Sequence, residues 1–342
     1  MRIWLIGLGT VGRWLLRALD SGAEDLRERY GFEAVVVGAG RGRDGFIHDP
    51  DGLAIAPLLA LLERSGSLED HPGAAHWGTV ADGLRETEAD VLVEVGSSPA
   101  SDGEPGATHV RAALERGIPA VCSNKWPLAH RGVELARLAR ERRTALRAEA
   151  TVMSGTPVLS ALREGLAGAR PAAARGVLNA TANFILSAIA AGAPYEEAVE
   201  SARAQGLAER DPSADLDGHD SVAKVMILAA LVFGVQLRVQ EVAREGIAGL
   251  DPSTLRAAAA AGEPVRLVET IEAGQAGGLR AAVGPGPVPA GDPLAATGGA
   301  TCGLVVRADP VGEVAVIGPG AGPELAGQGV LSDLIAVART VP

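Results

Sequence analysis

The chain has 342 residues, and its 31 basic and 42 acidic residues give a net charge of −11. This length is enough for two domains with separate cores. Hydrophobic residues make up 47% and charged residues 21%, which is the profile of a globular protein and excludes wholesale disorder. An acidic chain without a basic run argues against nucleic acid or an anionic membrane as the main partner.

Cysteine usage and hydropathy indicate the compartment. Cys122 and Cys302 are far apart in the sequence, so they make neither a disulfide framework nor a metal cluster. The N-terminus starts directly in an apolar strand pattern, and no apolar run approaches the ~20 residues that a membrane helix needs. We therefore expect a soluble, cytoplasmic protein in a reducing compartment.

Residues 1–20 read as a strand, a glycine-rich turn and a helix. In a dinucleotide-binding turn the first glycine permits the tight turn, the second lets a pyrophosphate approach the backbone, and the third lets helix and strand pack closely. The alternative is a glycine turn that is merely structural, but the strand before it and the helix after it favour a dinucleotide site. The residues expected to line this site are Gly7, Gly9, Thr10, Val11 and Gly12.

The end of the second strand, Glu33–Ala39, bears on the choice between NAD and NADP. A site for NAD usually has an acidic residue here, which binds the ribose hydroxyls. This chain has Arg41 and Arg43 instead, and arginine suits a 2′-phosphate. We therefore expect NADP to be preferred over NAD, and the alternative is that both arginines are solvated loop residues.

Two further strands end in polar residues. The run Ala89–Gly96 reads as a buried parallel strand that leads into Ser97 and Ser98, and the strand Ala120–Ser123 is followed by Lys125. Ligands in open α/β sheets bind outside the carboxyl ends of strands, so we expect these side chains near the cofactor, with Lys125 toward the nicotinamide. The alternative for Lys125 is an ordinary surface lysine.

The second half of the chain has a different pattern. A charged helix at Gly132–Arg143 and the start of a strand at Ala145–Ala150 close the first half. Residues 149–159 are expected to form a turn whose free carbonyls could bind a cation or approach the substrate. Polar residues in 175–186 indicate a strand that runs into a capped helix. The other expected elements are a helix at 252–261, strands at 265–271, 278–283, 301–308 and 313–317, typical of an antiparallel sheet, a loop at 284–300 and a last apolar helix at 330–340.

The densest group of charges lies at residues 205–224. Five carboxylates are followed by Lys224, at the start of an apolar run, 225–234, that is long enough for a buried helix. Asp220 and Lys224 are four residues apart, so on a helix they share one face. One interpretation is an acidic helix N-terminus with an ordinary ion pair. The other is a polar pocket for a small zwitterion, in which carboxylates bind an ammonium group and the lysine binds a carboxylate or a reacting oxygen.

Taken together, these segments resemble the homoserine dehydrogenase family over nearly the whole chain and in the same order. Glu209, Asp220 and Lys224 stand at the spacing that the family uses for its site. The matching segments are GLGTVG at 7–12, VEVGSSP at 93–99 with GEPGATHV at 103–110, SNKWPLA at 123–129, EATVMSGTPV at 149–158, GVLNATANFIL at 176–186, the stretch 205–224 and GPGAG at 318–322.

The resemblance implies an α/β protein with two domains. The first is a Rossmann nucleotide-binding domain, residues 1–145 completed by 318–342, and the second is an α+β domain, residues 146–317, for substrate binding and dimerisation. It also implies the reversible NAD(P)H-dependent reduction of L-aspartate 4-semialdehyde to L-homoserine, a step of threonine and methionine biosynthesis, in a homodimer without a regulatory domain.

The roles of individual residues follow from the same resemblance. It implies catalysis by Lys125, Lys224 and Asp220. The remaining implied roles are substrate binding by Glu209, Asp215 and Thr181, cofactor binding by Gly320, and a monovalent cation, Na⁺ or K⁺, on backbone carbonyls of Glu149, Val152, Ser154 and Thr156.

Some positions depart from the family's pattern and leave alternatives open. A dehydrogenase of another small amino or carbonyl acid is one alternative, because the departures lie close to the substrate in the family. A non-catalytic nucleotide-binding protein is the other, although it would not need both Lys125 and Lys224. The departures are Met153, Ala180, Leu207 and His219.

Overall fold

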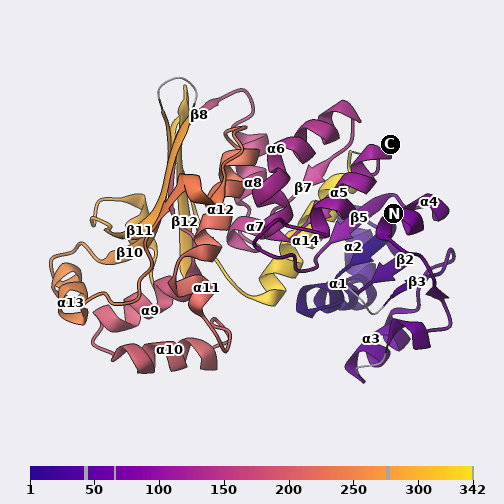
Figure 1. Ribbon diagram of the computed structural model, residues 1–342, viewed down its shortest axis with the longest axis horizontal. Helices are drawn as coiled ribbons and strands as arrows, with labels where there is room; N and C mark the ends of the chain where they lie inside the picture. Colours follow the sequence, from indigo (N-terminus) through magenta and orange to yellow (C-terminus); the bar gives the residue numbers. More distant parts are fainter. Residues whose placement is uncertain (42–44, 65–66, 275–277, 341–342) are drawn as a thin grey trace. The chain divides into compact units, whose positions relative to one another are not determined.

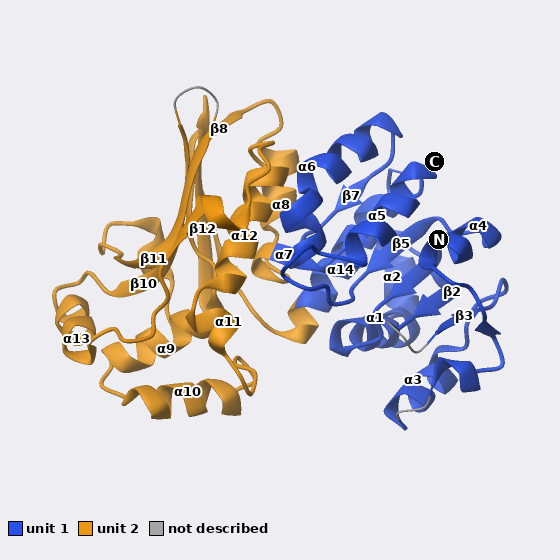
Figure 2. Cartoon of the chain, viewed as in Figure 1, with its two compact units in different colours: residues 1–151, 326–342 blue, residues 152–325 orange. Residues whose placement is uncertain are grey.

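The computed structural model describes the whole chain except residues 42–44, 65–66, 275–277 and 341–342 (Figure 1). It divides into two compact units, Met1–Thr151 with Ala326–Pro342, and Val152–Leu325 (Figure 2). Residues 318–325, which we expected in the first domain, belong to the second unit in this division. Among the described residues, every helix is too short or too polar to cross a membrane.

The first unit is built on a seven-stranded sheet in the order β4-β3-β2-β1-β5-β6-β7. The strands from β2 to β7 are parallel neighbours, whereas β3 and β4 are antiparallel additions at one edge. The chain leaves β1 toward β2 on one side and returns to β5 on the other, which is the strand order of a nucleotide-binding Rossmann fold. The strands are β1 (Arg2–Ile6), β2 (Val35–Gly40), β3 (Phe46–His48), β4 (Ala74–Ala75), β5 (Val91–Glu94), β6 (Ala120–Cys122) and β7 (Leu146–Arg147).

The helices of this unit include one that begins earlier than the sequence indicated. We expected a helix from Gly132, but α6 begins at Lys125, directly after Asn124. Pro127 falls in its first turn, where the missing N–H has no helical partner in any case, so the proline does not delay the helix. The helices are α1 (Thr10–Ser21), α2 (Ala23–Tyr30), α3 (Ile55–Glu63), α4 (Val80–Glu86), α5 (Gly106–Glu115), α6 (Lys125–Glu141) and α7 (Ala150–Met153).

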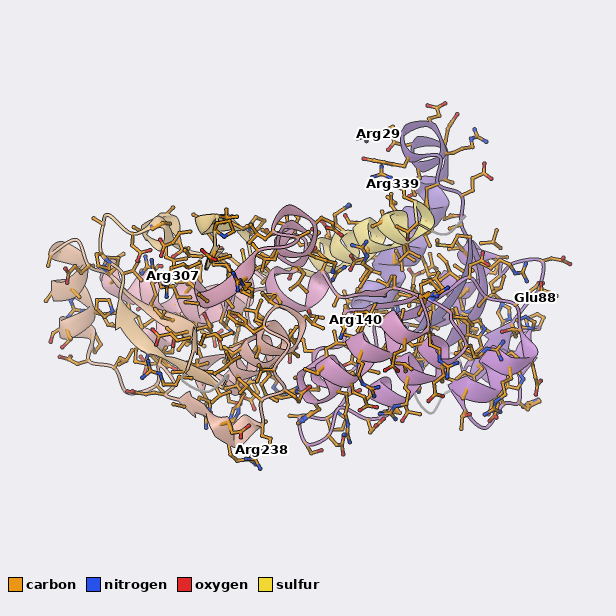
Figure 3. All side chains as sticks on the ribbon, turned by 90° about the horizontal axis from the view of Figure 1, so that it is seen from above. Arg29, Glu88, Arg140, Arg238, Arg307 and Arg339 are labelled. Carbon is orange, nitrogen blue, oxygen red and sulfur yellow. The ribbon has the colours of Figure 1, made fainter. Side chains whose placement is uncertain are left out.

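The C-terminal helix α14 (Pro323–Ala338) returns to the first unit and shares its core. Gly327 lies against the Trp14 ring of α1 so closely that a Cβ there would stand 2.2 Å from a ring carbon. At the surface, the guanidinium groups of Arg29 and Arg339 lie 5.1 and 5.9 Å from the centre of the Tyr30 ring (Figure 3). The helix therefore completes the nucleotide-binding unit.

The second unit is built on a six-stranded sheet in the order β13-β12-β8-β10-β11-β9, antiparallel except for the pair β9 and β11. The loop that we expected at 284–300 starts later, because β11 continues to Pro287. Beyond Val283 this strand pairs only with β10, so its other edge forms no backbone hydrogen bonds. Proline lacks a backbone N–H and is tolerated where that N–H would have no acceptor. The strands are β8 (Arg170–Val177), β9 (Val242–Arg244), β10 (Val265–Ala273), β11 (Leu279–Pro287), β12 (Thr301–Asp309) and β13 (Gly312–Pro319).

Two helices pack on this sheet and supply most of the polar groups described below. The helix α12 (His219–Leu231) packs on β10 and β11, and α9 (Ala180–Ala190) packs on β10 and β12 (Figure 1). Nearly all of α12 is buried, as its apolar run predicted. The other helices are α8 (Val158–Ser160), the π-helical turn η2 (Ala161–Gly165), α10 (Tyr195–Ala204), α11 (Ser213–Leu216) and α13 (Pro252–Ala260).

Candidate active site

The glycine-rich turn after β1 has the geometry of a dinucleotide site. Gly7 has a φ of +103°, and a Cβ on it would lie 2.5 Å from the Gly96 nitrogen. A Cβ on Gly12 would lie 2.0 Å from the Gly7 carbonyl oxygen, whereas one on Gly9 would meet nothing within 4 Å. Gly7 and Gly12 are therefore required by packing, while Gly9 and the exposed Thr10 leave the helix N-terminus open to a phosphate.

A buried carboxylate organises the end of β5 beside this turn. Glu94 accepts hydrogen bonds from the Gly96 N–H at 2.8 Å and from the Asn124 amide at 3.3 Å, and its other oxygen lies 2.6 Å from His109 Nδ1. The Asn124 amide also donates to the Ser98 hydroxyl at 2.8 Å. The sequence reasoning missed Glu94, although a glutamate inside an otherwise apolar buried strand is a usable signal.

The other expected cofactor residues of the first unit lie around strand ends. Ser98 is buried and Ser97 is exposed, and both lie in the loop that follows β5. Lys125 is the first residue of α6 and is partly buried. Arg41 follows β2 directly and is partly buried, while Arg43 lies outside the described residues.

The second unit contains a buried lysine. Lys224 lies on α12, and only 7% of its side chain is exposed. Its ammonium nitrogen is 2.9 Å from Asp220 Oδ2 and donates to the Leu178 carbonyl oxygen at 2.6 Å. Burial alone would lower the pKa of Lys224, but the charge and hydrogen bond of Asp220, together with the charges of Cys302 and Glu269, hold that pKa above its ordinary value. Lys224 is therefore a fixed ammonium group at neutral pH.

Asn179 joins this ammonium group to a second carboxylate. Its amide donates to Asp215 Oδ1 at 2.7 Å and to Asp220 Oδ2 at 3.2 Å. Its side-chain oxygen accepts from the Ala182 N–H at 2.8 Å, so Asn179 is also the N-cap of α9. Burial, together with the charge of Asp220, raises the pKa of Asp215. A positive charge placed close to Asp215 would therefore favour its ionised form.

The remaining expected substrate residues differ in their surroundings. Thr181 is buried, and its hydroxyl donates to the Leu207 carbonyl oxygen at 2.6 Å. Glu209 is exposed on the segment that follows. Thr181 thus anchors the loop that carries Glu209. Among the departures from the family pattern, Met153 and Ala180 are buried, and His219 is the exposed first residue of α12.

The structure adds a third carboxylate that the sequence reasoning missed. Glu269 on β10 is 2% exposed, and one of its oxygens accepts from the Leu178 N–H at 2.9 Å. The other accepts from the Ser221 hydroxyl. Every second residue of this part of β10 points to the buried face, and these residues are Leu267, Glu269 and Ile271. A glutamate between two apolar residues of a buried face was the sequence signal that could have revealed Glu269.

Gly320 lies in the second unit, against Cys302. A Cβ on Gly320 would stand 2.0 Å from the Cys302 sulfur, so this position excludes any larger residue. Burial raises the pKa of the Cys302 thiol to about 12, so it is neutral at physiological pH. Both cysteines are free and buried, in agreement with the expected absence of a disulfide framework.

The residues expected to hold a cation lie in a short helix and the turn after it. Residues Ala150–Met153 form α7, where we expected only a turn, and carbonyls in a last helical turn have no helical donor. Ser154 has a φ of 52°, and its hydroxyl donates to the Gly320 carbonyl oxygen at 3.1 Å. The Thr156 hydroxyl donates to the Pro319 carbonyl oxygen at 2.8 Å. Glu149 donates its backbone N–H to Asp333 Oδ2 at 2.7 Å, and Val152 is buried.

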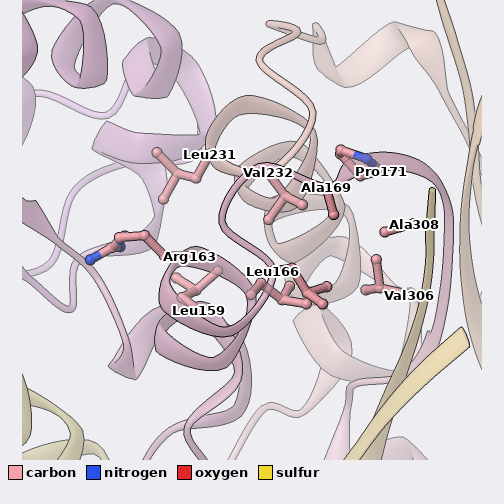
Figure 4. Close-up of a pocket in the computed structure, with 10 residues that line it drawn as sticks. Leu159, Arg163, Leu166, Ala169, Pro171, Leu231, Val232, Val306 and Ala308 are labelled. Carbon is pink, nitrogen blue, oxygen red and sulfur yellow. The ribbon is translucent and has the colours of Figure 1, made fainter. Parts of the chain in front are cut away.

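An apolar cavity of about 170 Å³ lies elsewhere in the second unit, between η2, the end of α12 and β12 (Figure 4). Leu159, Leu166, Val232 and Val306 line it, and among the described residues that line it Arg163 alone is charged. None of the expected site residues contributes to it. The polar cluster around Lys224 is therefore the better candidate for chemistry on a small amino acid.

A Rossmann unit with a dinucleotide turn and a second unit with a buried lysine among carboxylates define a nicotinamide-dependent dehydrogenase of a small polar substrate. Family models match both parts: "Homoserine dehydrogenase, NAD binding domain" over residues 7–149 and "Homoserine dehydrogenase" over residues 157–335. The chain belongs to the homoserine dehydrogenase family and is an oxidoreductase, which confirms the prediction made from its motifs.

Individual relatives agree with this assignment. An NAD(+)-dependent homoserine dehydrogenase of Pseudomonas canavaninivorans is 34% identical, covering 98% of this chain and 95% of that protein. A homoserine dehydrogenase of Methanocaldococcus jannaschii is 32% identical, covering 98% of each. A hyperthermophilic archaeal homoserine dehydrogenase solved in complex with NADPH has a TM-score of 0.80 at 30% identity, covering 100% of this chain and 98% of that one.

Proposed function

We propose that Lys224 or Lys125 handles the proton in the reversible reduction of L-aspartate 4-semialdehyde to L-homoserine. The observation that carries this proposal is the Lys224 ammonium, which is buried and held between Asp220 and the Leu178 carbonyl oxygen. An ammonium that is buried and already oriented stabilises the alkoxide that develops on the substrate oxygen. When bound, the nicotinamide supplies the hydride to the aldehyde carbon or accepts it in the reverse direction.

The carboxylates around Asn179 bind the amino acid end of the substrate in this proposal. Asp215 and Asp220 leave local negative charge that a substrate ammonium group would balance, and that ammonium would also favour the ionised form of Asp215. Glu209 is exposed on the loop that Thr181 anchors, so it can add a further carboxylate. In this proposal the carboxylates of the polar cluster select a small molecule with an ammonium group next to the reacting carbon chain.

The amino-acid composition supports the two lysine assignments. The printed sequence contains only two lysines, Lys125 and Lys224, and every other basic residue is an arginine. Arginine remains protonated in proteins and has a large planar head, so it replaces lysine on a surface more readily than at a proton-transfer position. Lysine thus occurs only at the two positions where we propose that an ammonium group acts on the reacting oxygen.

Methionine substitution at each lysine tests the proposal. Lys224→Met and Lys125→Met should each lower turnover by ~10²–10⁴-fold, because a positioned acid contributes about that much. Cofactor affinity should change far less. Arg238→Met is the matched control, since Arg238 is a surface cation with 78% of its side chain exposed. Near-normal turnover in both lysine variants would contradict the assignment.

Four further features belong to the same proposal. NADP is the preferred cofactor, because Arg41 directly follows β2 where NAD sites carry an acid. A monovalent cation, Na⁺ or K⁺, binds carbonyls at Glu149, Val152, Ser154 and Thr156. The protein works in the cytoplasm as a homodimer formed through its second domain, where Ile317 on the edge strand β13 is 39% exposed. Its domains are residues 1–145 with 318–342, and 146–317.

A further inference from the structure

Glu269 is a charged residue at a buried position of β10, where an apolar residue would be expected. It stands on the buried face of β10 between Leu267 and Ile271, which are 0% and 1% exposed. A buried carboxylate is costly unless it is paired and hydrogen-bonded. An apolar side chain would suit that face of the strand better, so the carboxylate has a role that packing does not supply.

Glu269 and Lys224 hold the two backbone groups of the same residue. Glu269 accepts from the Leu178 N–H at 2.9 Å, and Lys224 donates to the Leu178 carbonyl oxygen at 2.6 Å. Leu178 comes directly after β8 and before the cap Asn179, so its backbone is at the start of the polar cluster. The Ser221 hydroxyl, one turn before Lys224 on α12, donates to the other oxygen of Glu269.

We propose that Glu269 is a positioning residue for Lys224: it fixes the backbone of Leu178, whose carbonyl oxygen receives the ammonium, and it places a second buried negative charge near that ammonium. This inference rests on the proposed role of Lys224. Asp220 forms an ion pair with the ammonium directly. Glu269 acts on it indirectly, by holding the backbone of Leu178 and by its negative charge. Glu269 therefore sets the geometry of Lys224 without contacting the substrate.

The charge of Glu269 changes in a useful pH range. Burial raises its pKa from 4.5 to about 7, although the Ser221 hydroxyl, the Lys224 charge and the Leu178 N–H oppose this rise. The neighbouring titratable groups are Lys224 and Asp220 on α12 and Cys302 on β12. The pKa of Lys224 is raised and that of Cys302 is about 12, so neither changes charge between about pH 6 and 8.

Ionised Glu269 holds Leu178 more firmly than the neutral acid, because a hydrogen bond to a charged acceptor is about twice as strong as a neutral one. We therefore expect turnover with homoserine to fall by about tenfold as the pH drops through 7, which corresponds to the difference between a charged and a neutral hydrogen bond. The Michaelis constant for homoserine should change much less, since Glu269 does not contact the substrate.

Two substitutions separate the charge of Glu269 from its packing. Glu269→Gln keeps the size and the acceptor for Leu178 but removes the charge, so its turnover should be about tenfold lower above pH 7 and independent of pH around 7. Ser221→Ala removes a donor that favours the ionised form, so the fall in turnover should move to higher pH. Glu272→Gln is the control, because Glu272 lies on the same strand with 57% of its side chain exposed.

The test is to measure turnover as a function of pH in the wild type, in Glu269→Gln, in Ser221→Ala and in Glu272→Gln. Lys224→Met is measured in the same series. A fall near pH 7 that persists unchanged in Glu269→Gln overturns the inference. If Glu269→Gln does not fold, an unshifted profile in Ser221→Ala overturns it instead. Retained turnover in Lys224→Met refutes the proposed role of Lys224, on which this inference rests, whereas loss there with a wild-type profile in Glu269→Gln refutes only the role of Glu269.

Discussion

Among the described residues, Arg41 is the one on which the proposed preference for NADP depends most directly. A guanidinium there can bind a 2′-phosphate by charge-assisted hydrogen bonds, which are worth ~1.5–3 kcal/mol. We therefore expect NADP⁺ to bind roughly ten- to a hundred-fold more tightly than NAD⁺. Titration of both cofactors against the wild type and an Arg41→Ala, Arg43→Ala double variant measures this difference. Equal wild-type affinities, or a preference that survives the double change, would argue against it.

At the residue scale the sequence predicted the pair Asp220 and Lys224 correctly, because helical spacing alone brings them together. It could not predict that Asn179 would join them to Asp215, since that depends on β8 ending beside α11 and α12. Glu269 was missed for a related reason. Its role depends on contact with Leu178, 91 residues away in the chain, and no local pattern encodes such a contact.

At the scale of one element, α9 depends on Asn179 both as a cap and as a bridge between carboxylates. Asn179→Ala removes both functions, whereas Asn179→Ser keeps an N-cap oxygen but loses the amide donor to Asp215 and Asp220. Both variants should weaken homoserine binding or turnover. Only the alanine variant should also lose the cap, which is worth ~1 kcal/mol of unfolding free energy.

Chemical denaturation and steady-state kinetics on both Asn179 variants check this separation. Equal stability of the alanine and serine variants would show that capping contributes little here. Normal kinetics in both would show that the amide bridge to the carboxylates is not needed for substrate binding.

Element boundaries were harder to predict than element types, for identifiable reasons. We expected α6 to start at Gly132, but it starts at Lys125, and Pro127 is tolerated in its first turn because the N–H that proline lacks has no helical partner there. Pro285 and Pro287 suggested a loop, but they lie on a part of β11 that pairs on one side only. In both cases the element boundary depended on whether the backbone N–H at the proline position would have had a hydrogen-bond acceptor. The sequence alone does not show this.

At the scale of the whole molecule, the last helix of the chain completes the first unit, and this depends on a close contact. A Cβ on Gly327 would overlap the Trp14 ring, so Gly327→Ala should lower stability by ~1–3 kcal/mol through overpacking. Gln328→Ala is the control on the same helix, since Gln328 is exposed. Thermal unfolding with and without NADP⁺ measures both effects, and an unchanged melting temperature in Gly327→Ala would mean that α14 is not held through Trp14.

The fold class was predictable from the order of the motifs along the chain. A strand, a glycine turn and a helix at the N-terminus, followed by strands that end in polar residues, describe a Rossmann unit before any coordinates are known. The division at Thr151 and Ala326 was less predictable, because contacts define it and no change of composition marks it. The fold is thus encoded by sequence order, while its boundaries depend on packing.

The most direct test of the central claim is the rate of nicotinamide reduction by the purified protein with L-homoserine, compared with a panel of other small amino acids and hydroxy acids. The account predicts rapid reduction with L-homoserine, faster at low cofactor concentration with NADP⁺ than with NAD⁺, and a loss of ~10²–10⁴-fold in Lys224→Met. Equal or greater activity on another substrate of the panel, or full activity in Lys224→Met, would contradict it.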